Sequence, residues 1–106
     1  MDENTITMAF NIYRSERQNL FQANDELIEA KKDLKRKEYK VYVDGLIDGK
    51  NENDRKMQYI THTEKDIQLV ETKERDYLRA QMEFDLASYE VSRVKLLVAF
   101  LDLKNE

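Results

Sequence analysis

His62 is the only histidine in the chain, and with Asp66 it forms the pair of residues best suited to binding a metal ion. Residues four apart on a helix share one face, so both side chains could ligate the same ion. The sequence has no cysteine, no second histidine and none of the Glu-x-x-His pairs used by di-metal helical bundles. We therefore interpret His62 as a solvated histidine. A metal site assembled between subunits around it is a minor alternative.

Other signatures of catalysis are also absent from the sequence. It contains no glycine-rich phosphate loop, no nucleophile elbow and no kinase signature. Catalysis needs polar groups held in fixed positions, and no glycine-lined loop is present to hold them. We predict a protein without enzyme activity and without a cofactor.

Nucleic-acid binding is a second chemistry that the residue types allow, near the middle of the chain. Tyrosines stand there among lysines and arginines, and such surfaces can stack bases while the cations hold phosphates. Residues 31–66 carry ten basic and eight acidic side chains, so the acidic residues weaken the positive field. Tyrosines half-buried at a helix interface, among solvated charges, are the preferred interpretation. The candidate nucleic-acid contacts are Lys35, Arg36, Tyr39, Lys40, Tyr42, Lys50, Arg55, Lys56 and Tyr59.

The composition is that of a single folded domain. The chain has 106 residues, of which 38% are charged and 41% apolar, and this balance does not predict disorder. The absence of cysteine agrees with a reducing compartment. The first residues lack a basic start and an apolar signal-peptide core, and the longest apolar run, 96–101, is far shorter than a membrane span. We expect a cytoplasmic protein that does not enter a membrane.

Glycine and proline are the strongest punctuators of local structure, and here they indicate a single turn at the middle of the chain. The only glycines are Gly45 and Gly49, and there is no proline. The expected fold is all-α: a long antiparallel two-helix hairpin resembling a coiled coil. Its helices should span about 5–48 and about 52–103, with the turn at about 49–51.

The residues of the turn indicate how one helix stops and the next begins. Gly49 suits the left-handed position just after a helix end. Asn51 suits the N-cap of the second helix, where Asp54 could complete a capping box. Glu52 adds negative charge at the positive end of the helix dipole. Gly45 is then a weak point or a place of close packing.

Apolar residues recur every seven positions in both halves of the chain, which is typical of helices that pack as a left-handed coiled coil. In each half, large residues are followed three positions later by a second apolar series that contains most of the alanines. The first half has Ile6, Tyr13, Leu20, Leu27, Leu34 and Val41, with Ala9, Ala23 and Ala30. The second half has Val70, Tyr77, Phe84, Val91 and Val98, with Ala80, Ala87, Val94 and Leu101.

The position of the turn predicts which residues face one another across the seam. A turn near residue 50 pairs positions whose numbers add up to about 100, so Ala9 meets Val91 and Leu20 meets Ala80. Large side chains then face alanines and leave no voids. A register with numbers adding up to 107 matches sizes equally well but needs a longer loop. We prefer the first register.

A further set of apolar residues lies outside the seam, mostly in the half of the hairpin far from the turn. Two helices alone bury little surface, and a contiguous spare stripe is typical of an interface. We expect hairpins to self-associate into a four-helix or larger bundle. Alternatively, the first thirty residues fold back as a separate helix after a break at 24–26. The expected interface residues are Phe10, Phe21, Ile28, Leu78, Met82, Leu86, Tyr89, Leu96, Leu97, Phe100 and Leu103.

The run 42–55, with its Gly-Lys-Asn turn followed by Arg55, resembles the turn of small helical-hairpin proteins of phages and prophages, most of which are uncharacterised. Those proteins are richer in alanine, and the tyrosines of this chain depart from their pattern. The resemblance implies a mobile-element setting and no particular activity. We predict a structural or regulatory accessory protein that acts through self-association and binds a protein partner. A nucleic-acid-binding accessory protein is the alternative.

Overall fold

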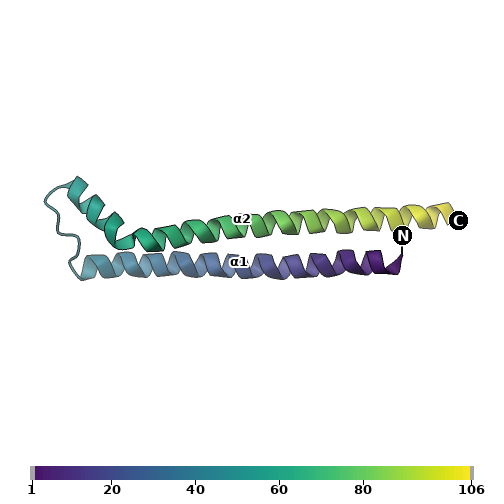
Figure 1. The fold of residues 1–106 in the computed structure, drawn as a ribbon, viewed down its shortest axis with the longest axis horizontal. Helices are drawn as coiled ribbons and strands as arrows, with labels where there is room; N and C mark the ends of the chain where they lie inside the picture. Colours follow the sequence, from purple (N-terminus) through teal and green to yellow (C-terminus); the bar gives the residue numbers. More distant parts are fainter. Residues whose placement is uncertain (1, 106) are drawn as a thin grey trace. The chain divides into compact units, whose positions relative to one another are not determined.

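The computed structural model describes residues 2–105 and contains two α-helices, α1 (Glu3–Val43) and α2 (Glu52–Asn105), joined by the loop 44–51 (Figure 1). The predicted all-α, two-helix fold is confirmed, and residues 2–105 form no strand. The predicted start of the second helix agrees with the structure. The first helix ends at Val43, five residues before the expected Asp48.

The chain divides into two compact units, which we describe separately. The terminal unit pairs residues up to Ala23 of α1 with residues from Tyr77 onward of α2. The loop unit spans Asn24–Asp76 and contains the loop. In each unit the two helices run antiparallel (Figure 1).

The heptad positions form the seam between the helices. All of the predicted positions are buried or half-buried except Leu101, which lies near the end of α2. Thr63 continues the series one heptad before Val70 and is fully buried, although it is polar. Its hydroxyl donates a hydrogen bond to the Tyr59 carbonyl at 2.7 Å, so burial leaves no unpaired group there. The buried apolar residues are Ala9, Ala23, Leu27, Ala30, Val41, Val70, Ala87, Val91 and Val94.

The preferred register is confirmed in both units. In the terminal unit Ala9 packs in one cluster with Val91, and the rings of Tyr13 and Phe84 lie 5.3 Å apart. These residue numbers add up to 100 and 97. In the loop unit Glu26 contacts Lys73, and Glu38 contacts Tyr59. The residue numbers of these two pairs add up to 99 and 97. A register of 107 would displace each of these pairs by at least seven residues, or about 10 Å.

Helix α1 runs without interruption through 24–26, so the alternative in which the first thirty residues fold back is wrong. Ala23 and Leu27 on either side of this stretch are buried in the seam, and this packing holds the polar residues between them in the helix. Asp2 caps the start of α1 by accepting hydrogen bonds from the Thr5 backbone N–H at 2.8 Å and its hydroxyl at 2.9 Å. The backbone hydrogen bond is the main reason that the pKa of Asp2 is lowered.

Gly45, and not Gly49, ends the first helix. Gly45 has a φ of +69°, the left-handed conformation that most side chains disfavour. Its N–H donates to the Tyr42 carbonyl, and the Leu46 N–H donates to the Val41 carbonyl at 3.1 Å. These two bonds form a Schellman motif, which satisfies carbonyls at the helix end. The expectation that Gly49 stops the helix was therefore wrong, because the glycine one turn earlier already supplies the left-handed residue.

Gly49 is required for a different reason, which is close approach to the start of α2. A Cβ at this position would lie 2.7 Å from the Asp54 Cβ and 2.9 Å from the Arg55 backbone nitrogen. Gln58 holds the loop in this place, because its side-chain oxygen accepts hydrogen bonds from the Asp48 and Gly49 N–H groups at 3.0 and 2.9 Å. Gly49 therefore permits contact between the loop and α2.

Asn51 caps α2 as predicted. Its side-chain oxygen accepts a hydrogen bond from the Asp54 N–H at 2.8 Å. Among the described residues, the Asn51 backbone N–H donates no return bond to the Asp54 carboxylate, so the capping box is half formed. Glu52 and Asp54 lie in the first turn of α2, where their charges favour the helix dipole.

The two glycines should respond differently to substitution. Gly45→Ala is expected to lower the free energy of unfolding by about 1–2 kcal/mol, because alanine is strained at positive φ. Gly45→Asn should cost much less, because asparagine tolerates this conformation. Gly49→Ala and Gly49→Asn should both destabilise, because the obstacle is a Cβ of any kind. Urea unfolding of the four variants measures these effects, and equal stability of the two Gly45 variants would contradict this assignment.

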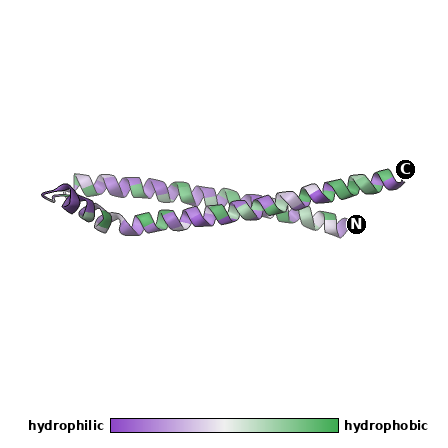
Figure 2. Cartoon of the chain, turned by 90° about the horizontal axis from the view of Figure 1, so that it is seen from above, coloured by the Kyte–Doolittle hydropathy of each residue, from purple (hydrophilic) through white to green (hydrophobic). Residues whose placement is uncertain are grey.

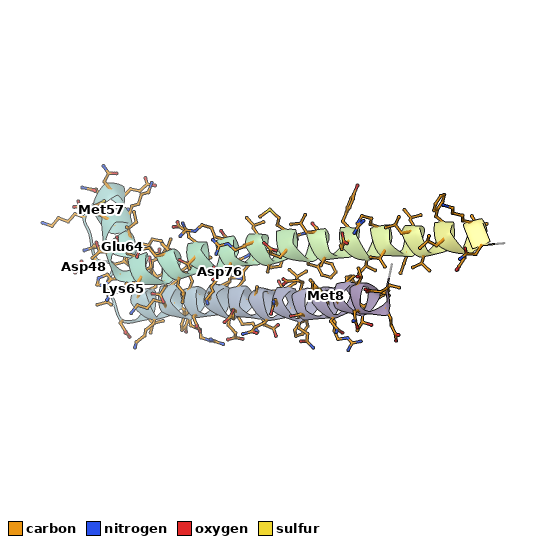
Figure 3. The ribbon with its side chains drawn as sticks, turned by 45° about the vertical axis from the view of Figure 1, so that its right-hand side comes forward. Met8, Asp48, Met57, Glu64, Lys65 and Asp76 are labelled. Carbon is orange, nitrogen blue, oxygen red and sulfur yellow. The ribbon has the colours of Figure 1, made fainter. Side chains whose placement is uncertain are left out.

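The first turns of α2 lean away from α1 within the loop unit (Figure 1). The bend falls between Met57 and Lys65 (Figure 3). Thr61 and Thr63 lie in this stretch, and each hydroxyl donates to a carbonyl four residues earlier, at 2.8 and 2.7 Å. Such bonds compete with the helical N–H for the same carbonyl and commonly bend helices.

Candidate self-association surface and loop cleft

Exposed apolar side chains form a stripe along the C-terminal half of α2, within the terminal unit. Figure 2 shows hydrophobic residues dominating this end of α2 and hydrophilic residues dominating around the loop. The side chains of the stripe are between 57% and 81% exposed. Exposed apolar residues that follow one line on a helix are typical of an interface. We call this set the outer stripe: Leu78, Met82, Leu86, Tyr89, Leu96, Phe100 and Leu103.

The outer stripe is itself a heptad pattern. From Met82 to Leu103 its members follow one another at alternating intervals of four and three residues, with Arg93 filling the one polar place. Because helix residues advance by about 100°, the stripe lies roughly on the opposite side of α2 from the seam. Helix α2 therefore carries two coiled-coil faces, of which α1 covers one.

Arg93 is held by its own helix at the centre of the outer stripe. Its guanidinium donates to the two carboxylate oxygens of Glu90 at 2.6 and 3.0 Å. This hydrogen-bonded pair lowers the pKa of Glu90 and raises the pKa of Arg93. Both side chains are about half exposed, so the pair itself adds little stability. Its effect is to fix the position of a charge in an otherwise apolar line.

The predicted interface residues of α1 do not form a comparable stripe. Phe10 is 38% exposed, and the Lys95 ammonium lies 5.9 Å from its ring centre. Phe21 and Ile28 are exposed but belong to different units. The remaining predicted residue, Leu97 of α2, is half-buried beside the outer stripe. The structure therefore gathers most of the predicted surface on α2.

Two exposed apolar residues of α1, Met8 and Ile12, were missed in the sequence. They lie one helical turn apart along a shallow groove of α1, and Met8 is labelled in Figure 3. Their spacing of four was the signal that could have found them. Two neighbouring residues make a small patch, and we assign them no role.

A cleft at the loop gathers four of the predicted nucleic-acid contacts. It has a volume of about 380 Å³ and lies within the loop unit. The Tyr59 hydroxyl donates a hydrogen bond to a Glu38 carboxylate oxygen at 2.7 Å. This bond is the main cause of the raised pKa of Tyr59. The lining residues are Tyr42, Ile47, Glu52, Arg55, Lys56 and Tyr59.

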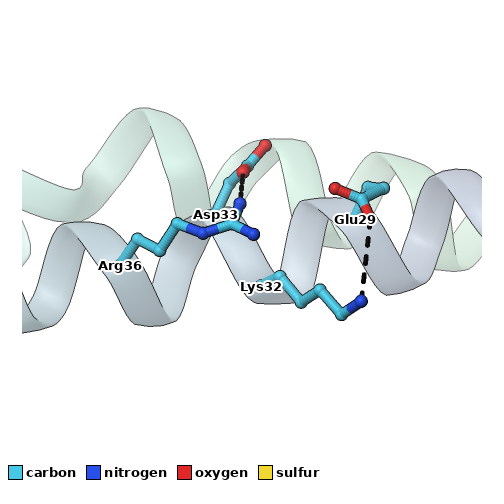
Figure 4. Close-up of polar contacts among 4 residues, drawn as sticks. All are labelled: Glu29, Lys32, Asp33 and Arg36. Atoms are coloured by element: carbon cyan, nitrogen blue, oxygen red, sulfur yellow. Dashed lines mark hydrogen bonds and ion pairs between the residues drawn. The ribbon is translucent and has the colours of Figure 1, made fainter.

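The other predicted nucleic-acid contacts lie outside the cleft. Arg36 is held by Asp33 at 2.6 Å, beside a second such pair between Lys32 and Glu29 at 3.8 Å (Figure 4). These pairs place a carboxylate next to each cation and reduce the positive field of this face. The remaining contacts are all exposed and are Lys35, Tyr39, Lys40 and Lys50.

Comparison of the chain with models of protein families, with curated proteins and with solved structures found no match.

His62 is exposed on α2. Over residues 2–105, no three histidine or carboxylate side chains are grouped in a way that could hold a metal ion. Neither helix contains, in the part of the chain that the structure describes, a stretch long and apolar enough to cross a bilayer.

The Tyr59–Glu38 hydrogen bond predicts a loss of stability at alkaline pH. Because the folded state raises the pKa of Tyr59, it holds the phenolic proton more tightly than the unfolded chain does. The stabilisation is complete below the ordinary tyrosine pKa of about 10 and is lost as the pH rises through the higher folded value. Urea unfolding on both sides of this pH range should show that the free energy of unfolding falls less at alkaline pH for Tyr59→Phe than for the native chain.

Tyr39→Phe is the matched control for this measurement. Tyr39 is 73% exposed, so its replacement should leave the alkaline loss unchanged. The same loss in Tyr59→Phe as in the native chain would show that the hydrogen bond has no such effect.

Proposed function

We propose that this protein is a non-enzymatic accessory protein that acts through self-association of its outer stripe. The observation that carries this proposal is the second heptad line on α2, which is exposed within the terminal unit. An uncovered line of seven large apolar side chains is unfavourable in water, and a second helix of matching pattern can cover it. Two hairpins joined in this way make a four-helix assembly.

Light scattering after gel filtration tests the proposal directly. The native chain should elute as a dimer or larger species at micromolar concentration, and Leu96→Asp should elute as a monomer, because Leu96 is 73% exposed in the stripe. Gln68→Asp is the matched control, since it adds the same charge to an exposed position of α2 outside the stripe. A monomeric native chain would overturn the proposal.

The biological setting that we propose is structural or regulatory, in a phage or prophage, with action in the cytoplasm. The similarity of the run 42–55 to turns of small phage helical proteins supports the mobile-element setting. An assembled bundle also presents long polar helix faces on which a protein partner can dock. Co-purification of one protein with the native chain, and its loss with Leu96→Asp, would support a partner that recognises the assembled form.

A nucleic-acid-binding accessory role is the second candidate. The loop cleft supports it, because the cleft brings Tyr42, Arg55, Lys56 and Tyr59 together. Glu52 lines the same cleft and opposes binding of phosphate. A labelled single-stranded oligonucleotide should bind at low salt and dissociate as salt is raised. Arg55→Ala should weaken this binding, and absence of binding at low salt would remove the candidate.

A further inference from the structure

From Met82 to Phe100, the spacing of the positions in the outer stripe is the same in both directions along α2, and Leu78 and Leu103 lie outside this symmetric part. Taken about a centre at residue 91, Met82 corresponds to Phe100, Leu86 corresponds to Leu96, and Tyr89 corresponds to Arg93. The number pairs all add up to 182. Each pair joins members of the two interleaved seven-residue series, which is how residues meet in an antiparallel coiled coil. Such symmetry is the requirement for an interface between two identical surfaces related by a two-fold axis.

We propose that two copies of the chain pair antiparallel through the outer stripe of α2. In the proposed register, the numbers of the residues that face each other add up to 182. This inference rests on the proposed self-association and specifies its geometry. Met82 then packs on the partner's Phe100, and Leu86 packs on the partner's Leu96. Each contact occurs twice, once on either side of the two-fold axis. The contacts are apolar and include a methionine sulfur against an aromatic ring.

The charge in the stripe selects this register. At 182 the Arg93 guanidinium faces the partner's Tyr89, whose ring can accept a cation on its face. A shift of one heptad makes the numbers of facing residues add up to 189 or 175. It places Arg93 against the partner's Leu96 or Met82 and buries the charge against an aliphatic chain. A parallel, in-register pair would bring the two Arg93 side chains together, where like charges repel.

The Glu90–Arg93 ion pair makes the central charge tolerable in the interface. Its two hydrogen bonds hold the guanidinium against its own helix in the single chain. Near the two-fold axis the two ion pairs lie close together, so each arginine lies between its own Glu90 and the partner's ring. A neutral, hydrogen-bonded arrangement costs less to bury than an isolated charge does.

Disulfide cross-linking tests the register, since the chain has no cysteine of its own. Leu86→Cys and Leu96→Cys are made as separate full-length proteins, one with a size tag, then mixed under reducing conditions and oxidised. The mixture should form the tagged–untagged cross-link, because the two positions face each other. Each variant alone should cross-link poorly, because its equivalent cysteine lies ten residues away along the helix, or about 15 Å.

Leu86→Cys mixed with Leu103→Cys is the matched control. These positions add up to 189 and are displaced by one heptad, so they should cross-link at least tenfold more slowly than the first mixture. Efficient cross-linking of Leu86→Cys alone would indicate a parallel pair and overturn the inference. No cross-link in either mixture, with light scattering still showing an oligomer, would overturn the register and leave the proposed function standing. A monomer by light scattering would overturn both.

Discussion

Val94→Asp is expected to destabilise the terminal unit strongly. Val94 is 1% exposed and packs in one cluster with Ala9 and Val91. An aspartate there is a charge without a partner, and its burial costs on the order of 3–5 kcal/mol. Domains of this size are stable by about 5–15 kcal/mol, so much of the stability would be lost. Circular dichroism should show a melting temperature lower by roughly 15–30 °C.

Leu96→Asp is the matched control for this prediction. It introduces the same charge two residues away, at a side chain that is 73% exposed. We expect it to keep the helical signal of the single chain and to lose self-association. Val94→Ala should fall between the two, since it removes apolar contacts without adding a charge. A melting temperature for Val94→Asp equal to that of Leu96→Asp would show that the seam is not the core of the unit.

Arg93→Leu is expected to strengthen self-association by about tenfold or more, which corresponds to about 1.4 kcal/mol. Leucine fills the polar place in the outer stripe and removes the charge at its centre. A single polar residue in a coiled-coil face fixes the register at a cost in stability. The variant should therefore also lose register specificity, and the Leu86→Cys and Leu103→Cys mixture should cross-link more readily in the Arg93→Leu background. Sedimentation equilibrium measures the affinity.

Arg75→Leu is the matched control for the affinity. Arg75 is exposed and belongs to the same seven-residue series as Leu96, but it lies in the loop unit, outside the outer stripe. Its replacement adds the same apolar surface and should leave the affinity unchanged. Weaker self-association in Arg93→Leu would contradict the view that Arg93 opposes association while setting the register.

The helices and their seam could be predicted from the sequence because both depend on local rules. Side chains recurring every seven residues share one face of a helix whatever lies around them, so Leu27, Val70 and Val91 were identifiable as core. The register followed from one turn of limited length. Thr63 was missed because its burial depends on a hydrogen bond to its own helix, and hydropathy does not report such a bond.

The roles of the two glycines could not be predicted, because both residues lie in the same short stretch and either could take the left-handed position. The tertiary structure decides between them. Gly45 adopts the positive φ, while Gly49 is needed because the loop places it against Asp54 at the start of α2. Likewise, composition shows spare apolar residues on both helices, but only the packing shows which remain exposed. Phe10 is partly covered by Lys95, whereas the α2 residues keep one continuous exposed line.

The sequence by itself thus determined the helices, the seam and its register, because helical periodicity is a property of the chain alone. The loop geometry depends on contacts between the loop and the start of α2, and the surface left for a partner depends on contacts between the two helices, so only the tertiary structure decided them.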